Sequence, residues 1–141
     1  MKGISWRSEQ GAAAVEFAVV AVLFLTIVFG IIELGILMFD KHILTNASRE
    51  GARAGVVMRV PRVSDAEIVG KVEGYASDFM ITFGPSSALS TTVSPPETAR
   101  TGSLFGTELV VEVTYPFEFL VLSNFGLGPK TLRAETRMRM E

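Results

Sequence analysis

Apolar residues follow one another almost without interruption from residue 12 to residue 39, which is the strongest pattern in the chain. As an α-helix this run would be about 42 Å long, more than the roughly 30 Å hydrocarbon core of a bilayer. Glu16 and Glu33 lie near its two ends. The pattern predicts one membrane-spanning helix over 12–39, with Glu33 at a boundary where it reaches water or contacts another subunit.

A secretory signal peptide is the first alternative, because Lys2 and Arg7 precede the apolar run. The hydrophobic part of a signal peptide is about 7 to 15 residues long, and a small-residue cleavage site follows it. Here the small residues 11–14 come before the run, and the run is longer. This order favours a retained membrane helix over ordinary signal cleavage.

The helical pattern continues beyond the span and predicts an extramembrane continuation over residues 40–60. Its apolar positions recur at helical spacing, namely at Ile43, Ala47, Gly51, Ala54 and Met58. Small residues at Ala47, Gly51 and Gly55 allow close approach of another backbone. The partner is either the chain's own sheet or a helix of another subunit. Arg49 and Arg53, one turn apart, are interpreted as a solvated or headgroup-facing pair.

A small domain is predicted over residues 61–141, beginning at the helix-breaking Pro61. Ser64 and Glu67 form a capping-box pattern ahead of a short helix. Its apolar positions are Ile68, Val72, Ala76 and Phe79.

Strands are predicted over 89–93, over 109–115 up to Pro116, and over 132–140, where apolar and charged residues alternate. We expect residues 117–122 to resume the second strand. The predicted fold class is α+β, with a short helix or the end of the long one packed on an antiparallel sheet.

Composition excludes several functions. The net charge of -2 and the pI near 5.5 provide no basic surface for nucleic acid. Without cysteine there is no thiolate metal site and no thiol nucleophile, and His42 is the only histidine. We therefore predict no enzyme, no cofactor and no metal. The phenylalanines of the domain are interpreted as core, with a hydrophobic ligand patch as the alternative; they are Phe105, Phe117, Phe119 and Phe125.

Four segments carry a family resemblance. Residues 11–18 (GAAAVEFA), with Arg7 upstream, resemble the prepilin-peptidase signature of type IV pilins. Residues 46–55 (NASREGARAG) resemble the stretch after the membrane helix in TadE-like proteins, which are minor pilins or pseudopilins of the tight-adherence (Flp) pilus. Residues 113–117 (VTYPF) and 134–139 (AETRMR) are also similar to segments of that family.

The resemblance implies a pilin-like fold and a leader, residues 1–11, that prepilin peptidase removes between Gly11 and Ala12. Glu16, followed by Phe17, would then align the incoming subunit by contacting a neighbour's new N-terminus. The implied partners are the peptidase, other pilin and pseudopilin subunits, the inner-membrane assembly platform and membrane lipid. The resemblance also makes Arg49 and Arg53 candidates for partner binding.

The orientation implied by processing is a cytoplasmic N-terminus in the bacterial inner membrane and a periplasmic domain, with incorporation into an extracellular pilus as a further expectation. The distribution of basic residues does not favour this orientation, because two precede the helix and Lys41, Arg49 and Arg53 follow it. The alternative function is an unprocessed single-pass membrane protein whose outer domain binds a ligand or an envelope partner.

Overall fold

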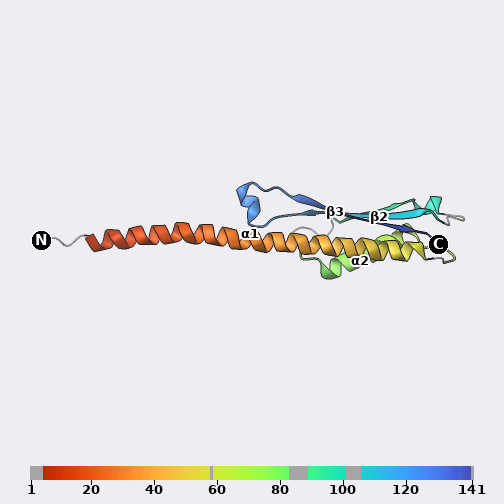
Figure 1. Cartoon of the computed structure of the whole chain (residues 1–141), viewed down its shortest axis with the longest axis horizontal. Coiled ribbons are helices and arrows are strands. Elements are labelled where there is room, and N and C mark those ends of the chain that lie inside the picture. Colours follow the sequence, from red (N-terminus) through yellow and green to blue (C-terminus); the bar gives the residue numbers. More distant parts are fainter. Residues whose placement is uncertain (1–4, 58, 83–88, 101–105, 141) are drawn as a thin grey trace.

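The longest element is one continuous helix, α1, which covers Ser5–Val56. The computed structural model describes residues 5–57, 59–82, 89–100 and 106–140, with side chains described from Gly11 onward. The first half of α1 projects away from the rest of the chain, and its second half lies along the other elements (Figure 1). A single helix therefore links the exposed apolar segment to the folded domain.

The second helix, α2, covers Asp65–Phe79 and begins where the capping box predicts. The Ser64 side chain accepts a hydrogen bond from the Glu67 N–H at 3.2 Å, which satisfies one of the free donors of the first turn. Three of the four predicted apolar positions are buried. The fourth, Phe79, is 52% exposed, and its ring packs against Tyr75 with the ring centroids 5.0 Å apart.

Three antiparallel strands form the sheet in the order β1-β2-β3. They are β1 (Ser90–Ser94), β2 (Glu108–Phe117) and β3 (Lys130–Arg139). Burial alternates along β2 and in the first half of β3, as the apolar and charged positions predict. On the outer face, Arg133 pairs with Glu112 across the two strands at 2.7 Å. The charged face of the sheet therefore faces solvent, and the apolar face is free to pack on the helices.

Two details of β2 differ from the prediction. Pro116 does not interrupt the strand but pairs with Thr131 of β3. The first residue of β1, Ser90, pairs with Thr114, two residues before Pro116. Residues 117–122 do not resume the strand: β2 ends at Phe117, and a 3-10 helix, η3, covers Leu122–Phe125.

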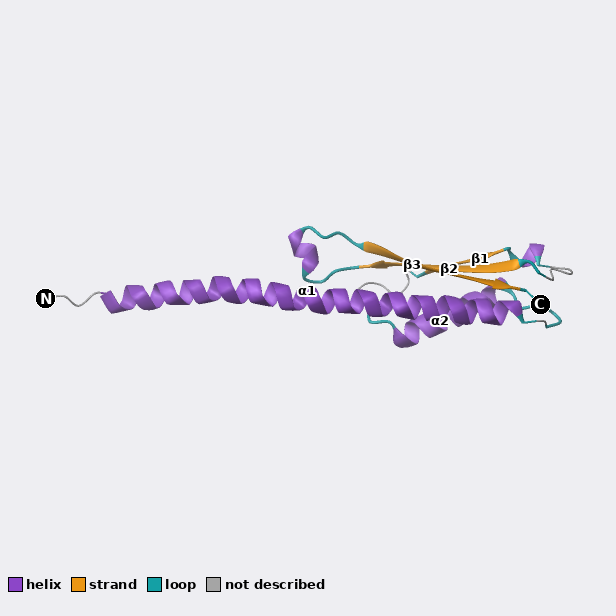
Figure 2. Ribbon diagram, in the orientation of Figure 1, coloured by secondary structure: helices purple, strands orange, loops and turns teal. Residues whose placement is uncertain are grey.

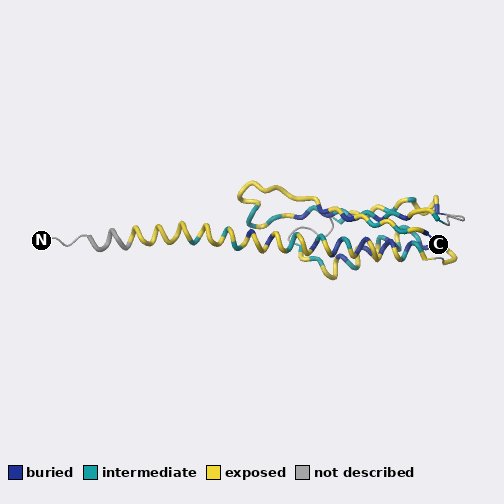
Figure 3. Tube along the Cα trace, in the orientation of Figure 1, coloured by how far each residue is buried: buried dark blue, intermediate teal, exposed yellow. Residues whose placement is uncertain are grey.

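Both helices pack on one face of the sheet (Figure 2). A second 3-10 helix, η2, covers Glu97–Ala99 between β1 and β2. The core combines α1, α2, β2 and β3; its larger members are Leu44, Ile68, Val72, Leu109, Val111, Val113, Tyr115, Phe117 and Leu132. Burial is concentrated in this half of the molecule, whereas the projecting half of α1 is exposed (Figure 3). The fold is thus α+β, as predicted.

The second half of α1 belongs to the domain. Leu44, Ala47 and Ala52 are buried in the same core as α2 and the sheet. The helix ends at Val56, short of the predicted end at residue 60. The helical continuation predicted over 40–60 is therefore part of the folded domain. It packs against the elements formed by residues 61–141.

Candidate functional site

The segment around the predicted cleavage site lies within the projecting helix. Residues 11–20 are all exposed, and apart from its chain neighbours and the adjacent backbone of its own helix, no described atom lies within 4 Å of where a Cβ of Gly11 would be. Ala12 and Glu16 are four residues apart on the same helix, so they are neighbours one turn from each other. Phe17 is 74% exposed. The four predicted residues are thus presented together on an uncovered surface.

The exposed apolar surface of α1 extends from Gly11 to Phe29. Three residues of this stretch are half-buried, namely Ala21, Thr26 and Val28, and the next residue, Gly30, is buried. At 1.5 Å per residue, residues 11–29 extend about 28 Å, close to the thickness of a hydrocarbon core. The Thr26 hydroxyl donates to the Val22 carbonyl at 2.8 Å and is thereby satisfied within the helix.

The helix is long and apolar enough to cross a membrane, and almost none of its most apolar part is buried within the protein. A core helix of a soluble domain would be covered by its own chain. Glu16 is the single charged residue between Gly11 and Ile32. Within the described residues this carboxylate forms no hydrogen bond or ion pair. An isolated carboxylate in an apolar helix is costly in lipid, and a positively charged partner from another molecule would lower that cost.

Glu33 is not a solvated boundary residue: it is 3% exposed and bound to its own chain. Its Oε1 accepts hydrogen bonds from the N–H groups of Leu120 and Val121 at 2.8 and 2.5 Å, and its Oε2 accepts one from Leu122 at 3.0 Å. The donors lie just before η3 and at its first residue. N–H groups at the start of a helix have no partner within the helix, and a carboxylate is a favourable acceptor for them. Glu33 therefore attaches the β2–β3 connection to α1.

The glycine stripe of α1 packs against the chain's own elements. A Cβ at Gly51 would lie 2.4 Å from Cγ2 of Val72 in α2. A Cβ at Gly55 would lie 2.4 Å from Cδ2 of Leu109 in β2 and 2.7 Å from Cδ1 of Ile68. Ala47 is fully buried in the same interface. Between the two alternatives left open by the sequence, the structure places these small residues within the domain.

Arg49 and Arg53 lie on the opposite, exposed side of α1. In the described part of the chain neither forms an ion pair or hydrogen bond. Elsewhere, polar contacts join α1 to β3: the Lys41 ammonium donates to the Arg133 carbonyl, and the hydroxyls of Ser48 and Thr136 are 2.7 Å apart. The structure therefore leaves the arginine pair available to solvent, headgroups or a partner.

One polar group of α1 is buried beside a cleft. Asp40 is fully buried, and its Oδ1 accepts a hydrogen bond from the Ile81 N–H at 3.0 Å. Its Oδ2 has no partner among the described residues. Burial raises the pKa of the nearby Tyr115 hydroxyl, a hydrogen bond with Thr82 opposes this shift, and the negative charge of Asp40 adds to it.

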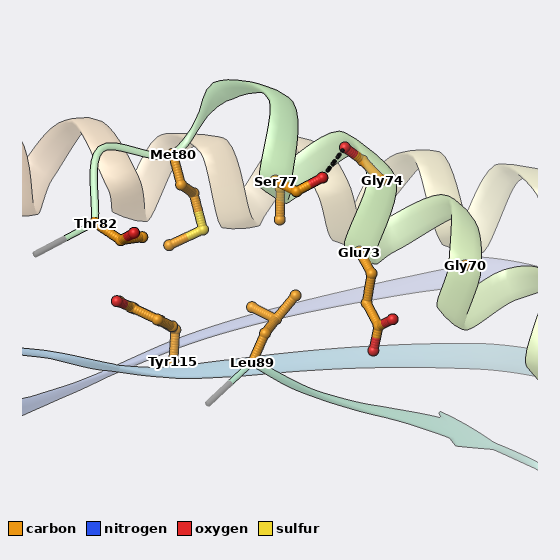
Figure 4. A pocket seen from close by; sticks show the side chains of 9 residues that line it. Gly70, Glu73, Gly74, Ser77, Met80, Thr82, Leu89 and Tyr115 are labelled. Atoms are coloured by element: carbon orange, nitrogen blue, oxygen red, sulfur yellow. Dashed lines mark hydrogen bonds between the residues drawn. The ribbon is translucent and has the colours of Figure 1, made fainter. Parts of the chain in front are cut away.

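The cleft has a volume of about 630 Å³ and lies between α2 and the sheet. Tyr115, Thr82 and Met80 meet at one end, and Glu73 extends toward the sheet at the other (Figure 4). No group of three or more acidic or histidine side chains that could hold a metal occurs among the residues that the structure describes. His42 is exposed on α1.

The fold and these surfaces define a class: an α+β protein carried on a single apolar helix that is long enough to anchor it in a membrane. The family model described as TadE-like protein matches residues 11–53. Over that segment the chain is similar to TadE-like proteins, which confirms the resemblance noted in the sequence and suggests a subunit associated with the Tad pilus. No curated protein and no solved structure matches the chain.

The matched segment covers two structurally different halves of α1. It begins at Gly11, within the exposed apolar surface, and ends at Arg53, within the part that packs on α2 and the sheet. The sequence singled out candidate residues in both halves but did not reveal the partner of Glu33. The only local signal for that role was a carboxylate inside an apolar run, because its three donors lie 87 to 89 residues further along the chain.

Proposed function

We propose that this protein is a minor pilin or pseudopilin, a non-enzymatic structural subunit for assembly of a tight-adherence type IV pilus. One observation carries the proposal. Glu16 is the single charged residue of the exposed apolar helix, it lies one turn after Ala12, and it has no partner among the described residues of its own chain. The TadE-like match begins at Gly11, immediately before this pair.

Cleavage after Gly11 would place a free amine at Ala12, and an α-amine is ordinarily protonated near neutral pH. The positively charged amine of one subunit then pairs with the negatively charged Glu16 carboxylate of a neighbour. Leaving one member of a deeply buried charge pair without its partner costs about 3 to 5 kcal/mol, and less near the membrane surface. Subunits in the correct register would satisfy both charges, whereas subunits out of register would leave them unpaired.

In this function the peptidase acts on a helix whose surface near the scissile bond is uncovered. A glycine at the cleaved bond has no Cβ to obstruct an approaching active site. The proposed location is the inner membrane, with residues 1–11 at the cytoplasmic side and the α+β domain in the periplasm. The proposed partners are prepilin peptidase, neighbouring pilin and pseudopilin subunits, the assembly platform and lipid.

Processing is tested by measuring the N-terminal mass of the membrane-extracted protein from cells with an active prepilin peptidase. The expected N-terminus is Ala12, and Gly11→Val is expected to retain the full leader. Gly35→Val is the matched control, because Gly35 is an exposed glycine of the same helix with open space around it. A wild-type chain that keeps residues 1–11 would refute processing and favour the unprocessed single-pass alternative.

The alignment role is tested separately with Glu16→Gln, which keeps the size of the side chain and removes its charge. We expect normal cleavage and a strongly reduced number of pili, because the neighbour's amine is left without a carboxylate. Thr26→Ala is the control, because Thr26 bonds only within its own helix turn. Normal piliation by the Glu16→Gln variant would show that the carboxylate does not align subunits.

A further inference from the structure

The connection between β2 and β3 is unusually apolar for a loop at the surface of a domain. Residues 119–129 (FLVLSNFGLGP) carry no charge. Three of its large apolar side chains are exposed: Leu120 is 61%, Phe125 is 59% and Leu127 is 44% exposed. The prediction that Phe125 is a core residue is therefore wrong, whereas Phe117 is buried beneath the sheet. Such a cluster of exposed apolar groups commonly marks an interaction surface.

This connection lies at the end of the domain that faces the projecting half of α1 (Figures 1 and 2). Two contacts hold it there. Glu33 accepts three hydrogen bonds from residues 120–122, and Cδ2 of Leu122 lies 3.4 Å from where a Cβ of Gly30 would be. The connection thus touches α1 at Gly30, the first buried residue after the exposed apolar stretch that begins at Gly11.

Charged residues are absent both from the helix segment 17–32 and from the connection 119–129, as expected for surfaces that contact lipid. On the helix, the first charged residue after Glu16 is Glu33, and its buried carboxylate accepts hydrogen bonds from three backbone N–H groups. On the connection, the nearest charged residues are Glu118 and Lys130, at the ends that join the strands. The contacts at Gly30 and Glu33 therefore place an uncharged loop beside the end of an uncharged stretch of helix.

We propose that residues 119–129 insert into the lipid interface of the membrane that α1 enters, with Leu120, Phe125 and Leu127 as its anchoring side chains. Interfacial segments bury their apolar face about 5–10 Å into the boundary between headgroups and acyl chains. The domain would then touch the bilayer at two places, the helix and the loop, which restricts its tilt and its rotation about α1. This inference rests on the proposed membrane insertion of α1.

The test uses the full chain, which has no cysteine, so single cysteines can be labelled uniquely. Phe125→Cys and Leu127→Cys are each labelled with an environment-sensitive fluorophore, in protein reconstituted at high lipid-to-protein ratio into phosphatidylcholine vesicles containing nitroxide-bearing lipid. Phe24→Cys, on the exposed apolar helix, is the reference for the bilayer interior. Thr92→Cys, exposed on β1, is the aqueous reference. Circular dichroism verifies that each variant is folded.

We expect lipid-borne nitroxide to quench both loop labels roughly fivefold more than the Thr92 label, because interfacial segments contact acyl chains directly. Loop labels quenched no more than the Thr92 label would overturn the inference. If the Phe24 label is quenched in that case, the loop inference fails alone and the membrane anchor stands. If the Phe24 label is also unquenched, both fail. A loop label in an apolar environment but protected from the nitroxide would indicate a protein contact and would also overturn the proposal.

Discussion

Replacing Glu33 with alanine should release the β2–β3 connection from α1. The carboxylate is 3% exposed and accepts three backbone N–H groups at 2.5 to 3.0 Å. A hydrogen bond to a charged group contributes about 1.5–3 kcal/mol, and a buried donor left unpaired costs about 1–3 kcal/mol. Leu120 is largely exposed, whereas Val121 and Leu122 are half-buried, so only the latter two N–H groups are counted as buried donors.

Counting the two half-buried donors, we expect Glu33→Ala to destabilise the attachment by about 2–4 kcal/mol. Since about 1.4 kcal/mol corresponds to a factor of ten in an equilibrium constant, the amides of residues 120–122 should exchange with solvent roughly 30-fold to several hundred-fold faster. The assay is amide hydrogen exchange of the full chain in detergent micelles. Exchange in the paired parts of β2 and β3 should change little.

Two further variants sharpen this experiment. Glu33→Gln retains an oxygen for Leu120 and Val121 but turns an amide N–H₂ group toward Leu122, so faster exchange should be concentrated at Leu122. Glu50→Ala is the matched control, because Glu50 is an exposed carboxylate of the same helix. If residues 120–122 exchange no faster in Glu33→Ala than in Glu50→Ala, the carboxylate is not what holds the loop.

Two other predictions concern the packing of the helices, and both are checked by denaturant unfolding of the full chain in detergent. Gly51→Ala should destabilise the domain by about 1–3 kcal/mol, because the new Cβ would meet Val72. Gly35→Ala, in open space, should be neutral or stabilising by up to about 1 kcal/mol; equal effects of the two variants would contradict the packing argument. Ser64→Ala should cost about 1 kcal/mol through loss of the N-cap, and an unchanged stability would mean that the cap bond contributes nothing.

The elements that the sequence predicted well are those encoded by neighbouring residues. Ser64 and Glu67 mark the start of α2 because a capping box is completed within one turn. Alternation of Leu132 and Ala134 with charged residues predicts β3, because each side chain's face follows from its position in the pleat. In both cases the stabilising contact lies within a few residues or within one strand, so the pattern contains the information.

The elements that were missed depend on distant contacts. The role of Glu33 requires that residues 120–122 fold back onto the middle of α1, which no local pattern encodes. Gly51 and Gly55 indicate close packing, but the same spacing serves an own-chain or an intersubunit partner, and only the tertiary fold distinguishes the two. Pro116 lies within β2 and pairs with Thr131 of β3, and this pairing is a property of the assembled sheet.

The most direct test of the central claim is a zero-length cross-link within assembled native pili. A hydrophobic carbodiimide joins an amine to a carboxylate only when the two are in contact, and mass spectrometry identifies the joined peptides. The account predicts a cross-link between the Ala12 α-amine of one subunit and Glu16 of another, with isotope-mixed assemblies showing that it is intermolecular. Assembled subunits that still begin with residues 1–11, or that carry Glu16 activated by the reagent but never joined to a neighbour's N-terminus, would contradict it.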